Sequence, residues 1–306
     1  MSSIMTNTAA MTALRTLQQT NKSLESTQNR ISTGYRVSEA SDNAAYWSIA
    51  TTMRSDNKAL GTVQDALGLG SAKVDTAYTG MNAAIKVVDE IKTKLVAARE
   101  PGVDRAKVQE EITQLQGQLV SITTASSFSG ENWLSVDSGA ATYSATKSIV
   151  SSFDRSAAGT VSVNTVDIDI TATELFDADD QSGILDTTFT TTGAGAVTVS
   201  VSDLDITAAG IDNADIDDMI SAVDSALKDM TTAGSTLGAA KSRISIQKDF
   251  VSNLMDVIDS GISTLVDADM TKESTRLQAL QTQQQLGIQA LSIANSSAQS
   301  VLSLFR

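Results

Sequence analysis

Apolar residues recur at alternating spacings of four and three residues over two long stretches of the chain, and this heptad pattern constrains the possible folds more than any other feature. The first stretch runs from Ile49 to Leu95, and the second runs from Ile216 to Leu265. Each predicts a long helix with one continuous apolar seam, which a partner helix must cover. Because the two stretches match in length, we expect them to pair as a long antiparallel coiled-coil hairpin.

The single proline of the chain, Pro101, predicts where the first of these helices ends. It lies between Glu100 and Gly102, and a proline next to a glycine is a strong helix breaker. The same apolar spacing resumes at Val108 and continues to Ile122. We therefore expect a second, shorter helix that folds back across this turn.

The two ends of the chain also carry heptad spacing, which predicts a second helix pair. No charged residue occurs from Leu277 to Phe305, and the apolar residues Ile288 and Ile293 lie off the seam. More than one face of this segment therefore needs burial, and one partner helix cannot cover them all. We expect the ends to be disordered in the monomer and to become ordered against neighbouring subunits. The expected subunit-interface residues are Leu14, Leu17, Leu24, Ile31, Leu280, Leu291, Ala294, Val301 and Phe305.

The centre of the chain differs from both flanks. Val, Ile and Thr alternate with polar residues between Gly-rich joints, which predicts a small antiparallel β region. From Ser156 to Leu227 there are 14 acidic residues and no Lys or Arg, so this block accounts for the net charge of −14. Outward exposure on an assembly would explain both the polarity and the charge.

These patterns predict a mainly α fold with a small β region, divided into three parts. Residues 1–40 with 270–306 would form an inner coiled coil of the terminal helices. Residues 41–138 with 211–269 would form a helical rod, and residues 139–210 would form a variable, β-rich part that faces outward.

Composition excludes several functions. The chain has no His and no Cys, which removes histidine acid–base catalysis, thiol nucleophiles and the usual zinc sites. Its acidity argues against nucleic acid as a partner. The first 14 residues contain no Lys or Arg and no long apolar run, so we expect neither a signal peptide nor membrane insertion. We predict no catalytic, cofactor-binding or metal-binding residues.

Two Asp-rich runs, at residues 177–180 and 212–218, are candidate calcium sites. Neither has the central Gly and terminal Glu of the helix-loop-helix calcium pattern. For the second run, we expect the carboxylates to stabilise the start of the helix that begins near Ile216.

Two groups of residues at opposite ends of the chain resemble the signatures of bacterial flagellins. The first is Arg30-Ile-Ser-Thr-Gly-Tyr-Arg-Val-Ser38, followed by Asp42-Asn-Ala-Ala45, and the second includes Asp267-Ala-Asp-Met270 and Val301-Leu-Ser-Leu-Phe305. The resemblance covers about residues 1–135 and 215–306. Asn43, Tyr46 and Trp47 depart from many flagellins, and this variant resembles flagellins of soil alphaproteobacteria. The signature residues are Arg30, Gly34, Arg36, Asp42, Asn43, Asp269 and Asn295.

The resemblance implies a secreted structural subunit, and no enzyme, that polymerises into the extracellular flagellar filament for swimming motility. Its implied partners are further copies of itself, alone or with paralogous flagellins. They also include the flagellar type III export apparatus, a chaperone for the C-terminal helix, and the filament cap and junction proteins.

Three alternatives remain. A hook-filament junction protein would also assemble through terminal helices, but the length and the paired signatures favour the filament subunit. A cytosolic coiled-coil scaffold explains the heptads but not the uncharged C-terminal segment. A hydrolase with paired carboxylates ranks last, because no phosphate loop or nucleophile elbow accompanies the acids.

Overall fold

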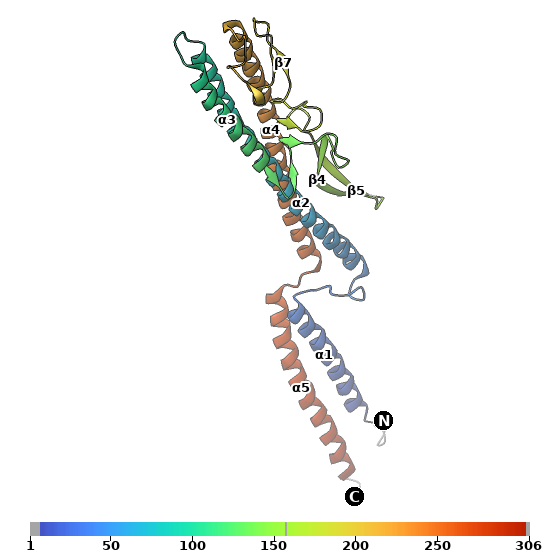
Figure 1. Ribbon diagram of the computed structural model, residues 1–306. Coiled ribbons are helices and arrows are strands. Elements are labelled where there is room, and N and C mark those ends of the chain that lie inside the picture. Colours follow the sequence, from blue (N-terminus) through green and yellow to red (C-terminus); the bar gives the residue numbers. More distant parts are fainter. Residues whose placement is uncertain (1–6, 157, 304–306) are drawn as a thin grey trace. The chain divides into compact units, whose positions relative to one another are not determined.

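The computed structural model describes residues 7–156 and 158–303, and the side chains of residues 298–303 lie outside the description. The described residues are mainly helical with a small β region, as the sequence predicts (Figure 1). They form two compact units. The terminal unit comprises the chain up to residue 58 and from residue 255 onward, and the central unit comprises residues 59–254. The helices are α1 (Thr8–Thr33), α2 (Ala44–Ala98), α3 (Arg105–Ala125), α4 (Asn213–Val266) and α5 (Met270–Ser303).

The predicted heptad seams form the core of the central unit. On α2, the side chains of Leu67, Met81 and Leu95 are fully buried, and on α4 those of Ile216 and Leu237 are fully buried as well. Burying a Leu, Ile or Met side chain contributes about 1.5–3 kcal/mol relative to exposure. The three-part division of the chain predicted above remains a prediction, because it concerns the assembled protein.

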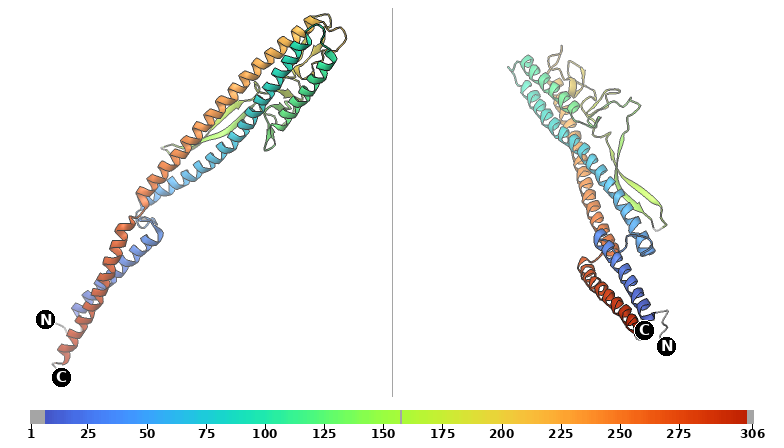
Figure 2. Two further views of the ribbon diagram at one scale, coloured as in Figure 1. Left: turned by 90° about the vertical axis from the view of Figure 1, so that its left-hand side faces the viewer. Right: turned by 90° about the horizontal axis from the view of Figure 1, so that it is seen from below.

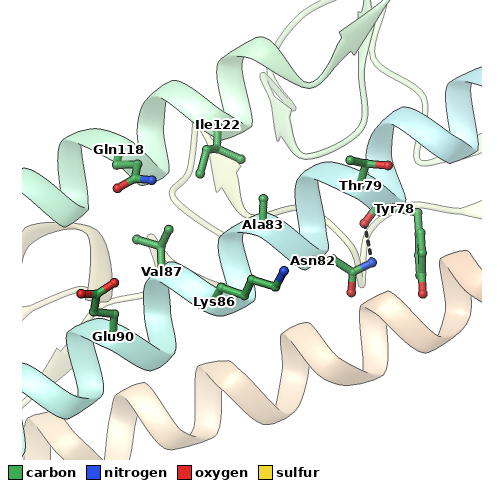
Figure 3. A pocket seen from close by; sticks show the side chains of 9 residues that line it. All are labelled: Tyr78, Thr79, Asn82, Ala83, Lys86, Val87, Glu90, Gln118 and Ile122. Carbon is green, nitrogen blue, oxygen red and sulfur yellow. Dashed lines mark hydrogen bonds between the residues drawn. The ribbon is translucent and has the colours of Figure 1, made fainter.

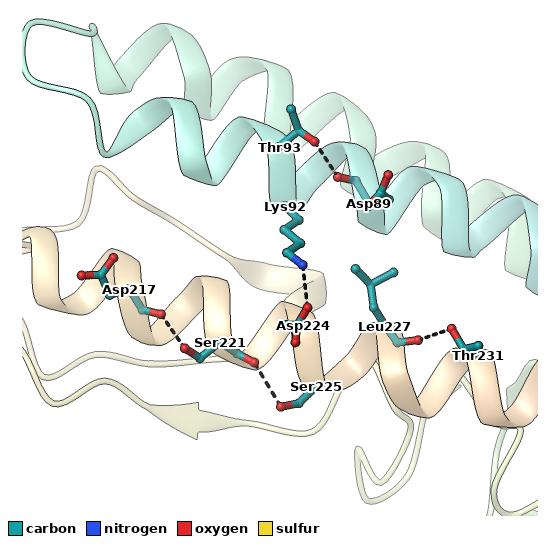
Figure 4. Close-up of polar contacts among 9 residues, drawn as sticks. All are labelled: Asp89, Lys92, Thr93, Asp217, Ser221, Asp224, Ser225, Leu227 and Thr231. Atoms are coloured by element: carbon teal, nitrogen blue, oxygen red, sulfur yellow. Dashed lines mark hydrogen bonds and ion pairs between the residues drawn. The ribbon is translucent and has the colours of Figure 1, made fainter.

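Ion pairs between α2 and α4 in the central unit fix the register of the two helices. Lys92 Nζ lies 2.5 Å from Asp224 Oδ1 (Figure 4), and Lys241 Nζ lies 2.7 Å from Asp75 Oδ1. Arg99 pairs with Asp217 at 2.5 Å. The two residue numbers add to the same total in all three pairs, so the helices run antiparallel without a shift in register. Partly exposed pairs contribute at most about 1 kcal/mol each, so they specify alignment more than stability.

The turn after α2 forms where Pro101 predicts it. Gly102 has φ +91°, which a residue with a side chain rarely adopts. Asp104 then caps α3, since its side chain accepts a hydrogen bond from the backbone N–H of Ala106. Ile112 and Leu119 of α3 are fully buried, so the predicted short helix and its apolar face are both present.

The β region is a set of two-stranded ladders, one of which differs from the prediction. The main hairpin, β4–β5, is antiparallel, with Ile149 opposite Val166. The short strands β3 and β6 pair in parallel, because the β4–β5 hairpin intervenes and returns the chain in the same direction. The strands are β1 (Ser127–Phe128), β2 (Glu131–Asn132), β3 (Ser135–Val136), β4 (Thr146–Arg155), β5 (Val161–Asp169), β6 (Phe176–Asp177), β7 (Phe189–Thr190) and β8 (Thr198–Val199).

Residues 196–203 also alternate apolar and polar side chains, which predicts a strand, but most of them do not form one. Beyond β8 the chain forms a 3₁₀ turn, η1 (Val201–Asp203). The side chain of Gln109 on α3 donates to the carbonyl of Leu204 and accepts from the N–H of Ile206. These bonds occupy backbone groups that a longer strand would have used in a ladder.

Two glycines of α2 give a matched test of the packing in the central unit. A Cβ at Gly80 would lie 2.8 Å from Leu134 Cδ1 and would also meet Ser126, whereas a Cβ at Gly68 would meet nothing within 4 Å. We expect Gly80→Ala to destabilise the protein by about 1–3 kcal/mol through overpacking. Gly68→Ala should stabilise it by up to about 1 kcal/mol, because Ala favours the helix. Thermal unfolding followed by circular dichroism checks both, and equal effects would contradict the packing described.

Candidate functional site

The terminal helices α1 and α5 pack side by side in the terminal unit (Figure 2). Asn7 Nδ2 donates to the carbonyl of Ala294 at 2.9 Å, and Gln284 Nε2 donates to Asn21 Oδ1 at 2.9 Å. The start of α1 therefore lies beside the far part of α5, so the pair is antiparallel. The sequence predicted this pairing of the two ends.

This helix pair buries little apolar surface. Within α1, all of which is described, the buried side chains are Thr20 and Thr27. Of the predicted interface residues, Leu280 is buried, Leu14 is exposed, and Leu17, Leu24, Ile31, Leu291 and Ala294 are half-buried. The side chain of Val301 and the whole of Phe305 lie outside the described residues.

Large apolar side chains project from the pair into solvent. Ile288 and Ile293 of α5 are 54% and 65% exposed, and they are the off-seam residues that the sequence indicated. Leu286 at 59% and Met11 at 45% are exposed in the same way, although the heptad pattern does not indicate them. The uncharged stretch around Leu286 could have signalled it. The terminal unit thus presents apolar surface that its described residues leave uncovered.

Most of the first signature group lies in a loop, residues 34–43, that is bound to the end of α4. Gly34 has φ +75° and ends α1, and its carbonyl accepts from the N–H of Ala268 at 2.8 Å. Arg36 donates twice, from its backbone N–H to the carbonyl of Val266 at 2.6 Å and from Nη2 to the carbonyl of Leu265 at 2.9 Å. The signature residues therefore build a joint between distant parts of the sequence.

Three other signature residues shape the ends of this joint. Asp42 Oδ2 accepts hydrogen bonds from the backbone N–H groups of Ser38 and Glu39. Asn43 Oδ1 accepts from the N–H of Tyr46 and so caps the start of α2. Asp269 caps the start of α5 by accepting from the N–H groups of residues 271 and 272.

The last two signature residues lie on the terminal helices. Arg30 on α1 pairs with the buried Glu273 on α5, with Nη1 3.4 Å from Oε1. Asn295 is exposed on α5, away from the joint.

The sequence placed the start of the α2 seam at Ile49, and the structure corrects this position. Ala50 is fully buried in a cluster with Val37, Ile262 and Val266, whereas Ile49 is 49% exposed. In the antiparallel register, Ala50 lies opposite Val266, the last residue of α4. Residues 44–49 therefore extend past the end of α4 and have no α4 surface to cover them.

The Asp-rich runs are engaged in hydrogen bonds within the chain. Asp212 Oδ1 accepts from the N–H groups of Ala214 and Asp215, so it stabilises the start of α4 as predicted. Asp177 accepts from the N–H groups of Ser138 and Asp179. In residues 7–156 and 158–303, no group of three or more acidic side chains is placed to hold a metal ion.

A shallow groove of about 480 Å³ lies between α2 and α3 (Figure 3). Ala83, Val87 and Ile122 form its apolar part, and Lys86 and Glu90 line it as well. The groove holds no nucleophile next to a base, so it offers no catalytic constellation. None of the described helices could cross a membrane.

Comparison with known proteins gives consistent matches at both ends of the chain. The bacterial flagellin N-terminal helical region matches residues 4–138, and the bacterial flagellin C-terminal helical region matches residues 220–305. Flagellin C of Rhizobium meliloti is 54% identical to the chain, with all of both proteins covered. Flagellin A of the same organism and a flagellin of Brucella melitensis are each 48% identical, also with all of both proteins covered.

The joint should respond to acid through Asp42. The hydrogen bond from the backbone of Ser38, followed by that from Glu39, holds the pKa of Asp42 below its ordinary value of 3.8. A lowered pKa in the folded state means that the carboxylate stabilises the joint above about pH 3.8 and loses this effect as the pH falls through the lower value. An NMR titration of the Ser38 and Glu39 amide signals should show an inflection below pH 3.8, and Asp42→Asn should remove it. An inflection at or above 3.8 would show that these bonds do not form in solution.

Proposed function

Because the chain belongs to the bacterial flagellin family, we propose that its terminal helices are the surfaces through which subunits bind one another. As a flagellin, the chain is the structural subunit of the extracellular flagellar filament and is not an enzyme. One observation carries the proposal: α5 is uncharged from Leu277 onward, yet it exposes Leu286, Ile288 and Ile293. A monomer gains nothing from such a surface, whereas a polymer buries it.

The weak burial between α1 and α5 supports a coupling between folding and assembly. Helices gain most of their stability in proteins from packing an apolar face, and the buried side chains described in α1 are both threonines. We infer that the ends are disordered in the monomer and become ordered in the filament, where neighbours cover Leu14, Leu17, Leu24, Ile31, Leu280, Leu291, Ala294, Val301 and Phe305. Fast amide exchange in both ends of the monomer and slow exchange in filaments is the expected result. Helices that are fully protected in the monomer would refute the coupling.

The assembled subunit would have the three parts that the sequence suggests, with residues 1–40 and 270–306 innermost. Residues 41–138 and 211–269 would form the rod, and residues 139–210 would face outward. The acidic block of the centre supports this orientation, since solvated charge is stable at an outer surface.

We propose further partners that the subunit meets during export and assembly. Flagellins A, B, C and D of one Rhizobium meliloti strain all align with the full chain, and filaments containing paralogous flagellins are consistent with this. We also propose that the chain leaves the cell through the flagellar type III export apparatus, that a chaperone protects α5 before export, and that cap and junction proteins bind at the filament ends.

A matched pair of variants on α5 tests the assembly surface. Ile293→Ser removes an exposed apolar side chain whose burial is worth about 1.5–3 kcal/mol, so the critical concentration for polymerisation should rise about tenfold or more. Gln283→Ser changes an exposed polar residue of the same helix and should have little effect. Sedimentation of filaments at a series of protein concentrations measures both. Equal critical concentrations for the two variants would argue against α5 as the contact surface.

A further inference from the structure

An aromatic patch lies where α2 begins, and the proposed role of the terminal helices does not account for it. We define the patch as Tyr35, Arg36, Tyr46, Trp47 and Arg54. Its three aromatic side chains are 37–41% exposed, although the chain has just 12 aromatic residues. Aromatic side chains carry large apolar areas, so their exposure at one place calls for an explanation.

The register of the helix pair accounts for this exposure. Residues 44–49 of α2 extend past Val266, where α4 ends, so the first turns of α2 lack a partner helix. The neighbouring Ile49 is exposed for the same reason. The patch therefore results from the fold itself, because α2 extends past the residue at which α4 ends.

Arginines lie over two of the three rings. The Arg36 guanidinium lies over the Tyr46 ring at 6.0 Å, and Arg36 is itself anchored to the carbonyl of Leu265. The Arg54 guanidinium lies over the Tyr35 ring at 4.9 Å. Trp47 and Arg54 are seven residues apart and so share one face of α2. Rings held in this way lose little conformational freedom when a partner binds.

Trp, Tyr and Arg are the residue types that dominate binding hot spots between proteins. The patch is built from these three types alone. In addition, Arg54 Nη2 is shielded from solvent and has no hydrogen-bond acceptor within the described residues. An aromatic surface with cationic groups fits an apolar side chain that has a carboxylate beside it.

The terminal unit offers such a counterpart on α4, at residues that do not belong to the patch. Val257 on α4 is 67% exposed, and the exposed carboxylate of Asp256 precedes it. A contact between two different surfaces of identical chains is head-to-tail, and it repeats into an open helical polymer. A second copy of the chain is therefore the occupant that fits both the chemistry and the symmetry.

We propose that the aromatic patch of one subunit binds the Asp256–Val257 segment of a second copy in the filament. This inference rests on the proposed assembly of the chain and adds a contact outside α1 and α5. It assigns to Trp47 the role of an anchor that becomes buried when subunits polymerise.

Fluorescence of Trp47 tests the proposal directly. The chain has two tryptophans, and Trp133 is buried at 2% exposure, so iodide should quench mainly Trp47 in the monomer. In filaments confirmed by electron microscopy, we expect quenching to fall several-fold and the emission to move to shorter wavelength. The variant Trp133→Phe, in which Trp47 is the single tryptophan, should show both changes more clearly. The intact chain decides the question if that variant does not fold.

The possible results separate the two proposals. Filaments in which Trp47 stays as open to iodide as in the monomer would overturn the patch contact and leave the proposed function intact. Failure of the intact chain to form filaments would instead contradict the proposed function, and with it this inference.

Substitutions give an independent measurement. Trp47→Ala should raise the critical concentration at least tenfold, and Trp47→Phe should restore most of the loss. Phe250→Ala removes a different exposed aromatic ring, 55% exposed on α4, and serves as the matched control with a small expected effect. Asp256→Lys should weaken assembly, because it places a cation opposite Arg36 and Arg54. Equal effects of Trp47→Ala and Phe250→Ala would refute a specific role for the patch.

Discussion

The antiparallel register between α2 and α4 is the constraint on which much of the structure depends. Two apolar seams must cover each other, and ion pairs such as Lys92 with Asp224 allow one alignment of the helices. In the terminal unit, Ala50 and Val266 lie in one buried cluster, and the chain beyond each of them must connect to the terminal helices. The signature loop makes one connection by binding the end of α4 through backbone and Arg36 hydrogen bonds.

The terminal unit differs from the central unit in how far its apolar side chains are buried. The central unit buries a continuous apolar core along the α2–α4 seam, whereas α1 and α5 expose Leu14, Leu286 and Ile293. Exposed apolar groups on paired helices weaken the monomer and favour association. In this chain, apolar surface without a partner lies on the terminal helices, where neighbouring subunits of a growing polymer can cover it.

Much of this fold could be predicted from the sequence because heptad periodicity is local and long. The seams and the pairing of the two ends follow from the spacing of apolar residues, and the break follows from Pro101 beside Gly102. The position of Ile49 could not be predicted, because the periodicity of one helix does not tell where its partner ends. The parallel pairing of β3 with β6 depends on contacts distant in sequence, and two-residue strands carry almost no pattern. The interface role of residues such as Leu17 and Ile31 remains a prediction, since it concerns contacts between chains.

The central claim is that subunits polymerise through their terminal helices. Electron microscopy of the purified full-length protein beside a version lacking residues 278–306, both in filament-promoting salt, tests it most directly. The account predicts long filaments from the intact chain and none from the truncated one. Filaments from the truncated chain would contradict assembly through α5, and discrete particles from both would favour a junction protein or a coiled-coil scaffold instead.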